Sequence, residues 1–312
     1  MQNMEKTDKP RMYTSIFKHH FRPLIMRAVL SLFSWLPLSL NHRLGALIGR
    51  LSYAINNSIQ RVARINIQHC YPDMEVAEQE LLIKDYLIET GKTLTETGVM
   101  WLQKEKQILN KIKAVSGEEL LQAAFEAGQG VILAAPHMGC WEIIGHYCSS
   151  HYPMTCMYRP QKTKLVDHMV RTGRTRFGMK LARTDASGIK QLIQALRSGE
   201  MVGILPDQVP QPGQGVFSNF FGSPAYSTTL LPRLAKKTGA RVIFTFAERL
   251  SNAEGYHIHF LPAADEIYHP QLEHSVTAMN HGVEQCIQLC PQQYQWGYKR
   301  FKIRPPGEGS YY

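Results

Sequence analysis

Cysteine is scarce in this chain of 312 residues, and its spacing fits no familiar framework. Six cysteines are present, and none belongs to a C-x-x-C pair. Disulfide-stapled proteins are usually much shorter, while redox motifs and cysteine-type zinc sites rely on the close pairs that are missing here. We therefore expect six reduced thiols packed in the core, which is typical of a protein exposed to the cytosol.

The sequence also lacks the common signatures of cofactor binding and of covalent catalysis. Neither a Walker A motif nor a Rossmann glycine fingerprint occurs, so we expect no nucleotide cofactor. No G-x-S-x-G elbow is present, so a serine nucleophile is not predicted. Low-complexity tracts and solenoid repeats are missing as well. With 44% hydrophobic and 19% charged residues, the composition indicates a folded protein with a large core.

Positive charge is abundant but unevenly placed. The net charge is +10, and residues 1–64 contain ten lysines and arginines against two acidic residues. The same region is apolar, with seventeen residues from 24 to 40 interrupted by Arg27 and Pro37. A membrane span needs about 20 apolar residues, so this stretch predicts either a short span or helices lying in the cytoplasmic interface among anionic headgroups. A core helix with a solvated basic face is the alternative.

Short apolar runs alternate with longer helical stretches after this segment. The predicted strands cover residues 112–115, 131–135, 154–158, 201–205, 241–246 and 256–261. The predicted helices cover residues 118–127, 141–150, 164–177, 187–197, 228–238 and 274–289. Asp73 is a predicted helix cap, and the longer helix that follows it should reach about residue 103, broken or bent near Gly91 and Gly98. The irregular residues 206–222 are predicted to form a functional loop.

This alternation predicts an α/β fold with a mixed, largely parallel central sheet flanked by helices. A membrane-associated helix should precede it. We expect residues 1–60 to form the basic, apolar anchoring segment and residues 61–312 to form the catalytic domain.

The chemistry is predicted to lie in residues 130–145, which read GVILAAPHMGCWEIIG. His137 follows the carboxyl end of a buried strand, where open α/β sheets bind their ligands. On a single helix, His137 and Glu142 would point roughly 140° apart, so they can meet only if the histidine lies in the turn before the helix. A histidine can deprotonate an alcohol near neutral pH, and a carboxylate on its other nitrogen fixes the tautomer. We therefore predict His137 as catalytic base and Glu142 as its partner.

These residues also match the H-x-x-x-x-D/E signature of the glycerol-phosphate acyltransferase superfamily. More closely, nearly the whole chain resembles the bacterial lipid A biosynthesis acyltransferases, the late lauroyl or myristoyl transferases. The matching stretches, in order, are RINI and CYP within residues 64–72, PHMGCWE at 136–142, YRP at 158–160, LPDQ at 205–208, FFG at 220–222 and WGYKRFK at 296–302. Small departures at Cys140 and at Gly297 and Tyr298 leave the histidine and glutamate untouched.

The resemblance implies transfer of a fatty acyl chain from acyl carrier protein to the hydroxyl of an acyl chain on a lipid A precursor. This secondary acylation in lipopolysaccharide biosynthesis would take place at the cytoplasmic side of the inner membrane, with membrane lipids as partners and no cofactor, metal or nucleic acid. Another membrane glycolipid or a phospholipid is the alternative acceptor. A basic membrane- or nucleic-acid-binding protein without catalysis is a distant alternative.

Five further residues are candidates for binding substrate. Arg159 follows a predicted strand and could contact a phosphate or a developing oxyanion. Asp207 and Gln208 follow another strand end and could order the loop or contact the sugar. Arg300 and Lys302 lie in a basic C-terminal run that could meet phosphates or the acidic carrier protein.

Two histidines invite a metal hypothesis that the sequence alone does not favour. His257 and His259 share one face of a predicted strand, as side chains two residues apart do. No third ligand is indicated by the spacing, so two ordinary histidines on a strand face are the preferred interpretation.

Overall fold

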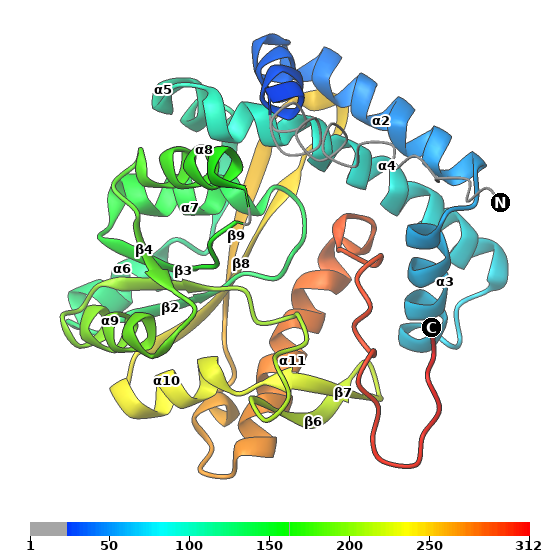
Figure 1. The fold of residues 1–312 in the computed structure, drawn as a ribbon. Coiled ribbons are helices and arrows are strands. Elements are labelled where there is room, and N and C mark those ends of the chain that lie inside the picture. Colours follow the sequence, from blue (N-terminus) through cyan, green and yellow to red (C-terminus); the bar gives the residue numbers. More distant parts are fainter. Residues whose placement is uncertain (1–23, 162) are drawn as a thin grey trace, which may run out of the picture.

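A seven-stranded mixed sheet forms the centre of the protein. The computed structural model describes residues 24–161 and 163–312. The strands follow the spatial order β1-β9-β8-β2-β5-β3-β4; Figure 1 labels β9, β8, β2, β3 and β4 of this sheet. Their bounds are β1 Ile112–Ser116, β2 Val131–Ala134, β3 Met154–Tyr158, β4 Lys180–Arg183, β5 Met201–Ile204, β8 Arg241–Arg249 and β9 Tyr256–Pro262. Among the described strands of this sheet, only β8 and β9 pair antiparallel, which confirms the largely parallel architecture.

Helices cover both faces of this sheet. They are α2 Leu38–Ala54, α3 Ser58–Cys70, α4 Val76–Leu102, α5 Glu105–Leu109, α6 Glu119–Glu126, α7 Trp141–His151, α8 Lys164–Thr175, α9 Ala186–Arg197, α10 Leu230–Thr238 and α11 Leu272–Leu289. The core between the sheet and α9, α10 and α11 contains Ile132 of β2, whereas the core beneath α6 and α7 contains its neighbour Leu133. Every residue of β2 is buried, as expected of a strand covered on both faces.

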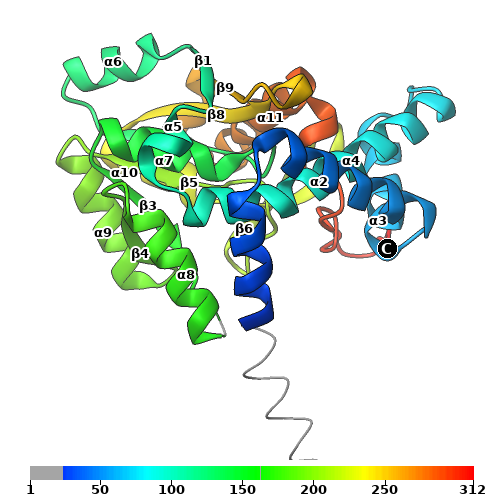
Figure 2. The ribbon, with the colours of Figure 1, turned by 90° about the horizontal axis from the view of Figure 1, so that it is seen from above.

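Glycines allow the N-terminal helices to lie directly against α4. A Cβ on Gly45 would come within 2.5 Å of the Lys92 backbone, and one on Gly91 within 2.0 Å of the Gly45 carbonyl oxygen. Only glycine permits backbones to approach this closely. Helix α2 lies beside α4 in both views (Figures 1 and 2), and its residues Leu47, Ile48 and Leu51 are exposed, whereas Gly45 and Gly49 are buried against α4.

The apolar N-terminal stretch folds as two helices. Residues 24–35 are helical, and α2 starts at Leu38, directly after Pro37. Within residues 24–161 and 163–312, no helix combines the length and the hydrophobicity that a membrane crossing requires. Residues 1–23 of the predicted anchoring segment lie outside the described part of the chain. The domain boundary at residue 60 stays a prediction, and it falls within α3.

Several predicted elements need correction. The long helix α4 runs unbroken through Gly91 and Gly98. At these two positions the missing side chain lets the backbone of a neighbouring helix approach α4 closely. The N-cap of α4 is Glu75, not Asp73. The edge strand β4 was not predicted. The predicted loop 206–222 contains a strand, since β6 (Gly215–Phe220) pairs antiparallel with β7 (Ser223–Thr228).

Candidate active site

His137 lies where two neighbouring strands end. It occupies the turn between β2 and α7, and Asp207 follows β5, the parallel neighbour of β2 with Ala134 opposite Ile204. Gly139 has a φ of 56°, and a Cβ there would lie 1.9 Å from the Ala247 carbonyl oxygen, so this turn requires glycine. The carboxyl edge of the sheet thus brings together residues that are 70 positions apart in sequence.

Asp207 is the carboxylate that binds His137. Its Oδ1 lies 2.8 Å from His137 Nδ1, and its Oδ2 accepts a hydrogen bond from the His137 backbone N–H at 2.9 Å. Burial opposes ionisation of Asp207, but the charge and hydrogen bonds of His137 outweigh it and hold the pKa of the carboxyl below its ordinary value. Because the carboxylate accepts the hydrogen bond of Nδ1–H, the neutral ring keeps Nε2 as its basic nitrogen.

The predicted pairing of Glu142 with His137 is wrong. Glu142 lies in the first turn of α7 as expected, but its two carboxylate oxygens accept hydrogen bonds from Arg174 of α8, at 3.0 Å from Nε and 2.5 Å from Nη2. Burial raises the pKa of Glu142, and the Arg174 guanidinium outweighs it, so the net shift is downward. Glu142 is therefore an ionised partner of an arginine.

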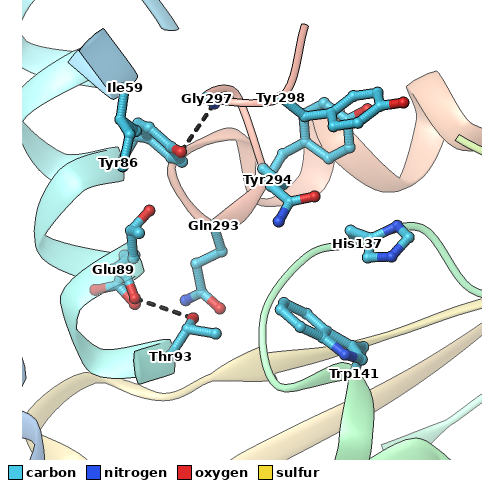
Figure 3. A pocket seen from close by; sticks show the side chains of 12 residues that line it. Ile59, Tyr86, Glu89, Thr93, His137, Trp141, Gln293, Tyr294, Gly297 and Tyr298 are labelled. Carbon is cyan, nitrogen blue, oxygen red and sulfur yellow. Dashed lines mark hydrogen bonds between the residues drawn. The ribbon is translucent and has the colours of Figure 1, made fainter. Parts of the chain in front are cut away.

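His137 lines a pocket of about 230 Å³. Figure 3 shows three walls: α3 and α4, the turn with His137 and Trp141, and the segment after α11. The lining residues are Ile59, Tyr86, Glu89, Thr90, Thr93, His137, Trp141, Gln293, Tyr294, Gln295, Gly297 and Tyr298. At its edge, Gln208 Nε2 lies 3.4 Å from His137 Nε2 and donates to Gln295 Oε1 at 3.1 Å. A hydroxyl bound in this pocket would lie beside His137.

Trp141 also lines a second, apolar pocket of about 60 Å³. Its walls are Leu133, Ala135, Trp141, Glu142, Ile144, Gly145, Met154, Cys156, Met157, Arg174, Met179, Gly203, Ile204 and Leu205. Within this lining, Glu142 and Arg174 are the charged residues, and they neutralise each other. The site thus has two compartments that share one tryptophan: the larger one includes several polar side chains, and the smaller one is mostly apolar.

The other predicted substrate residues divide into three groups. Asp207 and Gln208 both lie at His137, as described above. Arg159 and Lys302 are exposed, and the Lys302 ammonium lies 5.5 Å from the ring centroid of Tyr298, a residue of the larger pocket. Arg300 is only 2% exposed, so the prediction that it meets phosphates or the carrier protein is wrong. Its guanidinium donates to the Tyr226 carbonyl oxygen and to Ser227 Oγ.

A buried ion cluster around Arg249 contacts the turn that contains His137 and Gly139. Arg249 donates to Glu96 Oε2 at 3.0 Å and to the Gly139 carbonyl oxygen at 3.3 Å, while its backbone N–H donates to Gln293 Oε1 at 2.8 Å. This one side chain and its backbone therefore connect α4, the catalytic turn and a pocket wall.

Sequence reasoning missed the roles of Arg174, Gln295 and Arg249. Each lies far in sequence from the residue it binds. The one available signal concerned Asp207, because a polar residue directly after a strand end is expected at the same sheet edge as His137.

Comparison with known proteins gives a consistent result. The sequence profile of the family described as bacterial lipid A biosynthesis acyltransferase matches residues 14–303. The chain is 28% identical to a lipid A biosynthesis lauroyltransferase of Escherichia coli (strain K12) over 285 residues, covering 91% of this chain and 92% of that protein. It is 29% identical to the palmitoleoyltransferase of the same strain, with the same coverage. It is 30% identical to a lipid A biosynthesis acyltransferase of Haemophilus influenzae, covering 90% and 88%.

Proposed function

Because the chain belongs to the bacterial lipid A biosynthesis acyltransferase family, we propose that it transfers a fatty acyl chain from acyl carrier protein to a hydroxyl of an acyl chain on a lipid A precursor. The observation that carries this proposal is the hydrogen bond between His137 Nδ1 and buried Asp207, which keeps Nε2 as the basic nitrogen of a histidine that lines the larger pocket. Family membership makes the chain an acyltransferase; the donor, the acceptor position and the residue roles are our proposal.

In the proposed reaction, His137 Nε2 removes the proton of the acceptor hydroxyl as its oxygen attacks the thioester carbonyl. The new C–O ester bond forms, the C–S bond breaks, and the imidazolium returns the proton to the leaving thiolate. Asp207 stabilises the imidazolium and holds the ring in the required tautomer. The products are an acyloxyacyl group and the free thiol of the carrier protein.

We assign the apolar pocket beside Trp141 to the donor acyl chain. Half of its fourteen lining residues are leucine, isoleucine or methionine, whose side chains suit a hydrocarbon. Glu142 remains a candidate for the catalytic machinery, in a different role from the predicted one. Paired with Arg174, it joins α7 to α8 beside this pocket and so positions Trp141 between the two compartments. The exposed Arg159 and Lys302 are candidates for contacts with phosphates or with the acidic carrier protein.

We place the reaction at the cytoplasmic face of the inner membrane. Exposed apolar side chains follow the helix of residues 24–35, α2 and the start of α3, accompanied by exposed arginines. One of these side chains, Ile59, also lines the pocket at His137. A lipid acceptor could therefore pass from a bilayer surface to the basic nitrogen without crossing bulk water.

The test is transfer of a radiolabelled acyl chain from acyl carrier protein to a defined lipid A precursor by the purified full chain in detergent. His137→Ala should lower the rate by about 10²–10⁴, the usual contribution of a general base. Asp207→Asn, which keeps the shape and removes the charge, should lower it by a similar factor. His168→Ala, an exposed histidine on α8, is the matched control and should retain wild-type activity.

Three outcomes would contradict the proposal in different ways. Full activity in a folded His137→Ala protein would remove the histidine from the mechanism. Normal activity in Asp207→Asn would remove the carboxylate partner. If the wild type releases free fatty acid but acylates no lipid A precursor, the acceptor is wrong.

A further inference from the structure

Two histidines and a glutamate lie together on the hairpin of β8 and β9, outside the linings of the two pockets described above. Glu248 of β8 stands directly opposite His257 of β9 in the antiparallel register, and His259 follows on the same face of β9. The sequence gives only the two histidines of β9. The third ligand comes from the neighbouring strand, where no spacing in the sequence reveals it.

The three side chains converge on one point. One ring nitrogen from each histidine and one carboxylate oxygen lie within 4.8 Å of one another. His259 Nε2 is 3.0 Å from Glu248 Oε2, and the ring centroids of the two histidines are 3.8 Å apart. Ligands bound tetrahedrally to Zn²⁺ at 2.0–2.1 Å lie about 3.3 Å from each other. Small side-chain rotations are therefore enough to bring all three into coordinating distance.

We propose that Glu248, His257 and His259 form a binding site for a divalent transition metal of the zinc type, with water completing the coordination. Two imidazoles and one carboxylate are ligands that Zn²⁺ and its neighbours in the periodic table prefer over the hard cations. The side chains of His259 and Glu248 are 18% and 34% exposed, so an ion can enter from solvent.

Neighbouring groups support this arrangement. The ring of His259 stacks on Phe246 with centroids 4.5 Å apart and planes 9° from parallel, which fixes its orientation. Ser116 Oγ of β1 lies 2.8 Å from His257 Nε2 and provides the outer polar contact that ligating histidines usually have.

The site is separate from the acyl-transfer chemistry. None of its three residues lines the pocket at His137 or the apolar pocket beside Trp141. A bound ion would connect β8 to β9 next to Arg249, which in turn contacts the catalytic turn. The inference therefore goes beyond the proposed function, and the role we assign to the metal is to stabilise this hairpin.

The experiment titrates Zn²⁺ into the full chain in detergent, after chelator treatment and without a histidine tag, and follows binding by calorimetry. We expect one equivalent to bind the wild type. His259→Gln and Glu248→Gln should weaken that binding by more than about tenfold, since even loss of an outer-shell partner costs 10- to 100-fold. The matched control is His274→Gln, because His274 is exposed and lies beside a second histidine, His269, with ring centroids 4.6 Å apart.

Co²⁺ provides a second readout on the unmodified chain. The site predicts visible absorption typical of nitrogen and oxygen ligands, and a thermal midpoint that rises when the ion binds. A thiolate charge-transfer band would place the ion at cysteines and overturn the proposal. Equal affinity in the wild type and His259→Gln, or no binding by the wild type at micromolar Zn²⁺, would overturn it as well. Acyl transfer at 25 °C should be the same with and without the ion.

Discussion

At the scale of single residues, two carboxylates at this site are ionised for different reasons and serve different partners. Asp207 is 3% exposed and accepts two hydrogen bonds from His137, one from the ring and one from the backbone. Glu142 accepts two from Arg174. A proton taken up by His137 is therefore balanced by Asp207, whereas the charge of Glu142 is already neutralised. We expect removal of the Asp207 charge to affect proton transfer and removal of Glu142 to affect the geometry around Trp141.

A second residue-scale consequence concerns the length of the transferred chain. Gly145 of α7 lines the apolar pocket, and a Cβ at this position would lie 2.5 Å from Met179 Cε. Gly145→Leu should therefore shorten the pocket. We expect kcat/KM for a longer donor to fall about tenfold or more relative to a donor two carbons shorter, the discrimination that a methylene group usually provides. Competition between two labelled acyl carrier proteins measures this ratio directly.

Ser149→Leu is the matched control for this prediction. Ser149 lies one helical turn further along α7 and is not part of the pocket lining. The Ser149→Leu substitution should leave the ratio of kcat/KM for the two donors unchanged. An unaltered ratio in a folded Gly145→Leu protein would show that the donor chain binds elsewhere.

The position of His137 could be predicted from sequence, but its partner could not. An apolar run, a proline and a glycine before a helical pattern are local signals, and they place the histidine correctly after β2. Pairing between β2 and β5 is not local, because α7, β3, α8, β4 and α9 lie between them in the chain. The five-residue spacing made Glu142 the nearest carboxylate in sequence, while the sheet brings Asp207 nearer in space.

At the scale of elements, the stability of the site depends on a buried ion cluster between α4 and β8. Arg249 contacts Glu96 and Glu89, and Glu96 also accepts from Tyr256. Burial alone would raise the pKa of Glu96, but the Arg249 guanidinium outweighs it and holds that pKa at about 2. Arg249→Met leaves this carboxylate buried without its main counter-charge. We expect the free energy of unfolding at pH 7 to fall by about 3–5 kcal/mol, measured by urea denaturation.

The pH dependence gives this prediction its sign. In the wild type the ionised Glu96 contributes stability above its ordinary pKa of about 4.5, and this contribution is lost as the pH falls toward 2. In Arg249→Met the buried charge of Glu96 destabilises the protein, and protonation of the carboxyl removes this effect. The difference in the free energy of unfolding between the wild type and Arg249→Met should therefore become smaller as the pH drops below neutrality. The double variant with Glu96→Gln should recover part of the lost stability at pH 7; a further loss would mean that Glu96 is not the strained group.

Helices and buried strands could be predicted from periodicity, and the elements that were missed have physical reasons. The strand β4 lies at the edge of the sheet and has the sequence KLAR. Its two apolar residues lie between two basic ones, so no apolar run marks it in the sequence. In α4, Gly91 and Gly98 resemble helix breakers, since glycine lowers helix propensity. Their actual role depends on the backbones of Gly45 and Leu30, which approach them only in the folded molecule.

At the scale of the whole molecule, apolar and basic surface occur together at the N-terminal side. Leu24, Leu32, Trp35, Leu51 and Ile55 are each more than half exposed. Arg27, Arg43 and Arg50 are exposed on the helix of residues 24–35 and on α2, and Arg61 is exposed on α3. Such a combination is typical of helices lying in a membrane interface, where apolar side chains enter the lipid and arginines contact anionic headgroups. The helix of residues 24–35 projects from the body, as Figure 2 shows.

This arrangement predicts that the chain binds vesicles of anionic lipid and that salt weakens the binding. Ten basic residues among the first 64 supply the electrostatic attraction, which ions screen. Leu51→Glu should lower the affinity about tenfold in a flotation assay, because burial of one leucine side chain contributes about 1.5–3 kcal/mol. Ile189→Glu on α9, on a side of the molecule distant from α2 in both views, should bind like the wild type (Figures 1 and 2). Equal binding by Leu51→Glu, or binding indifferent to lipid charge and salt, would mean that this surface does not meet the membrane, and the acceptor would then have to reach His137 by another route.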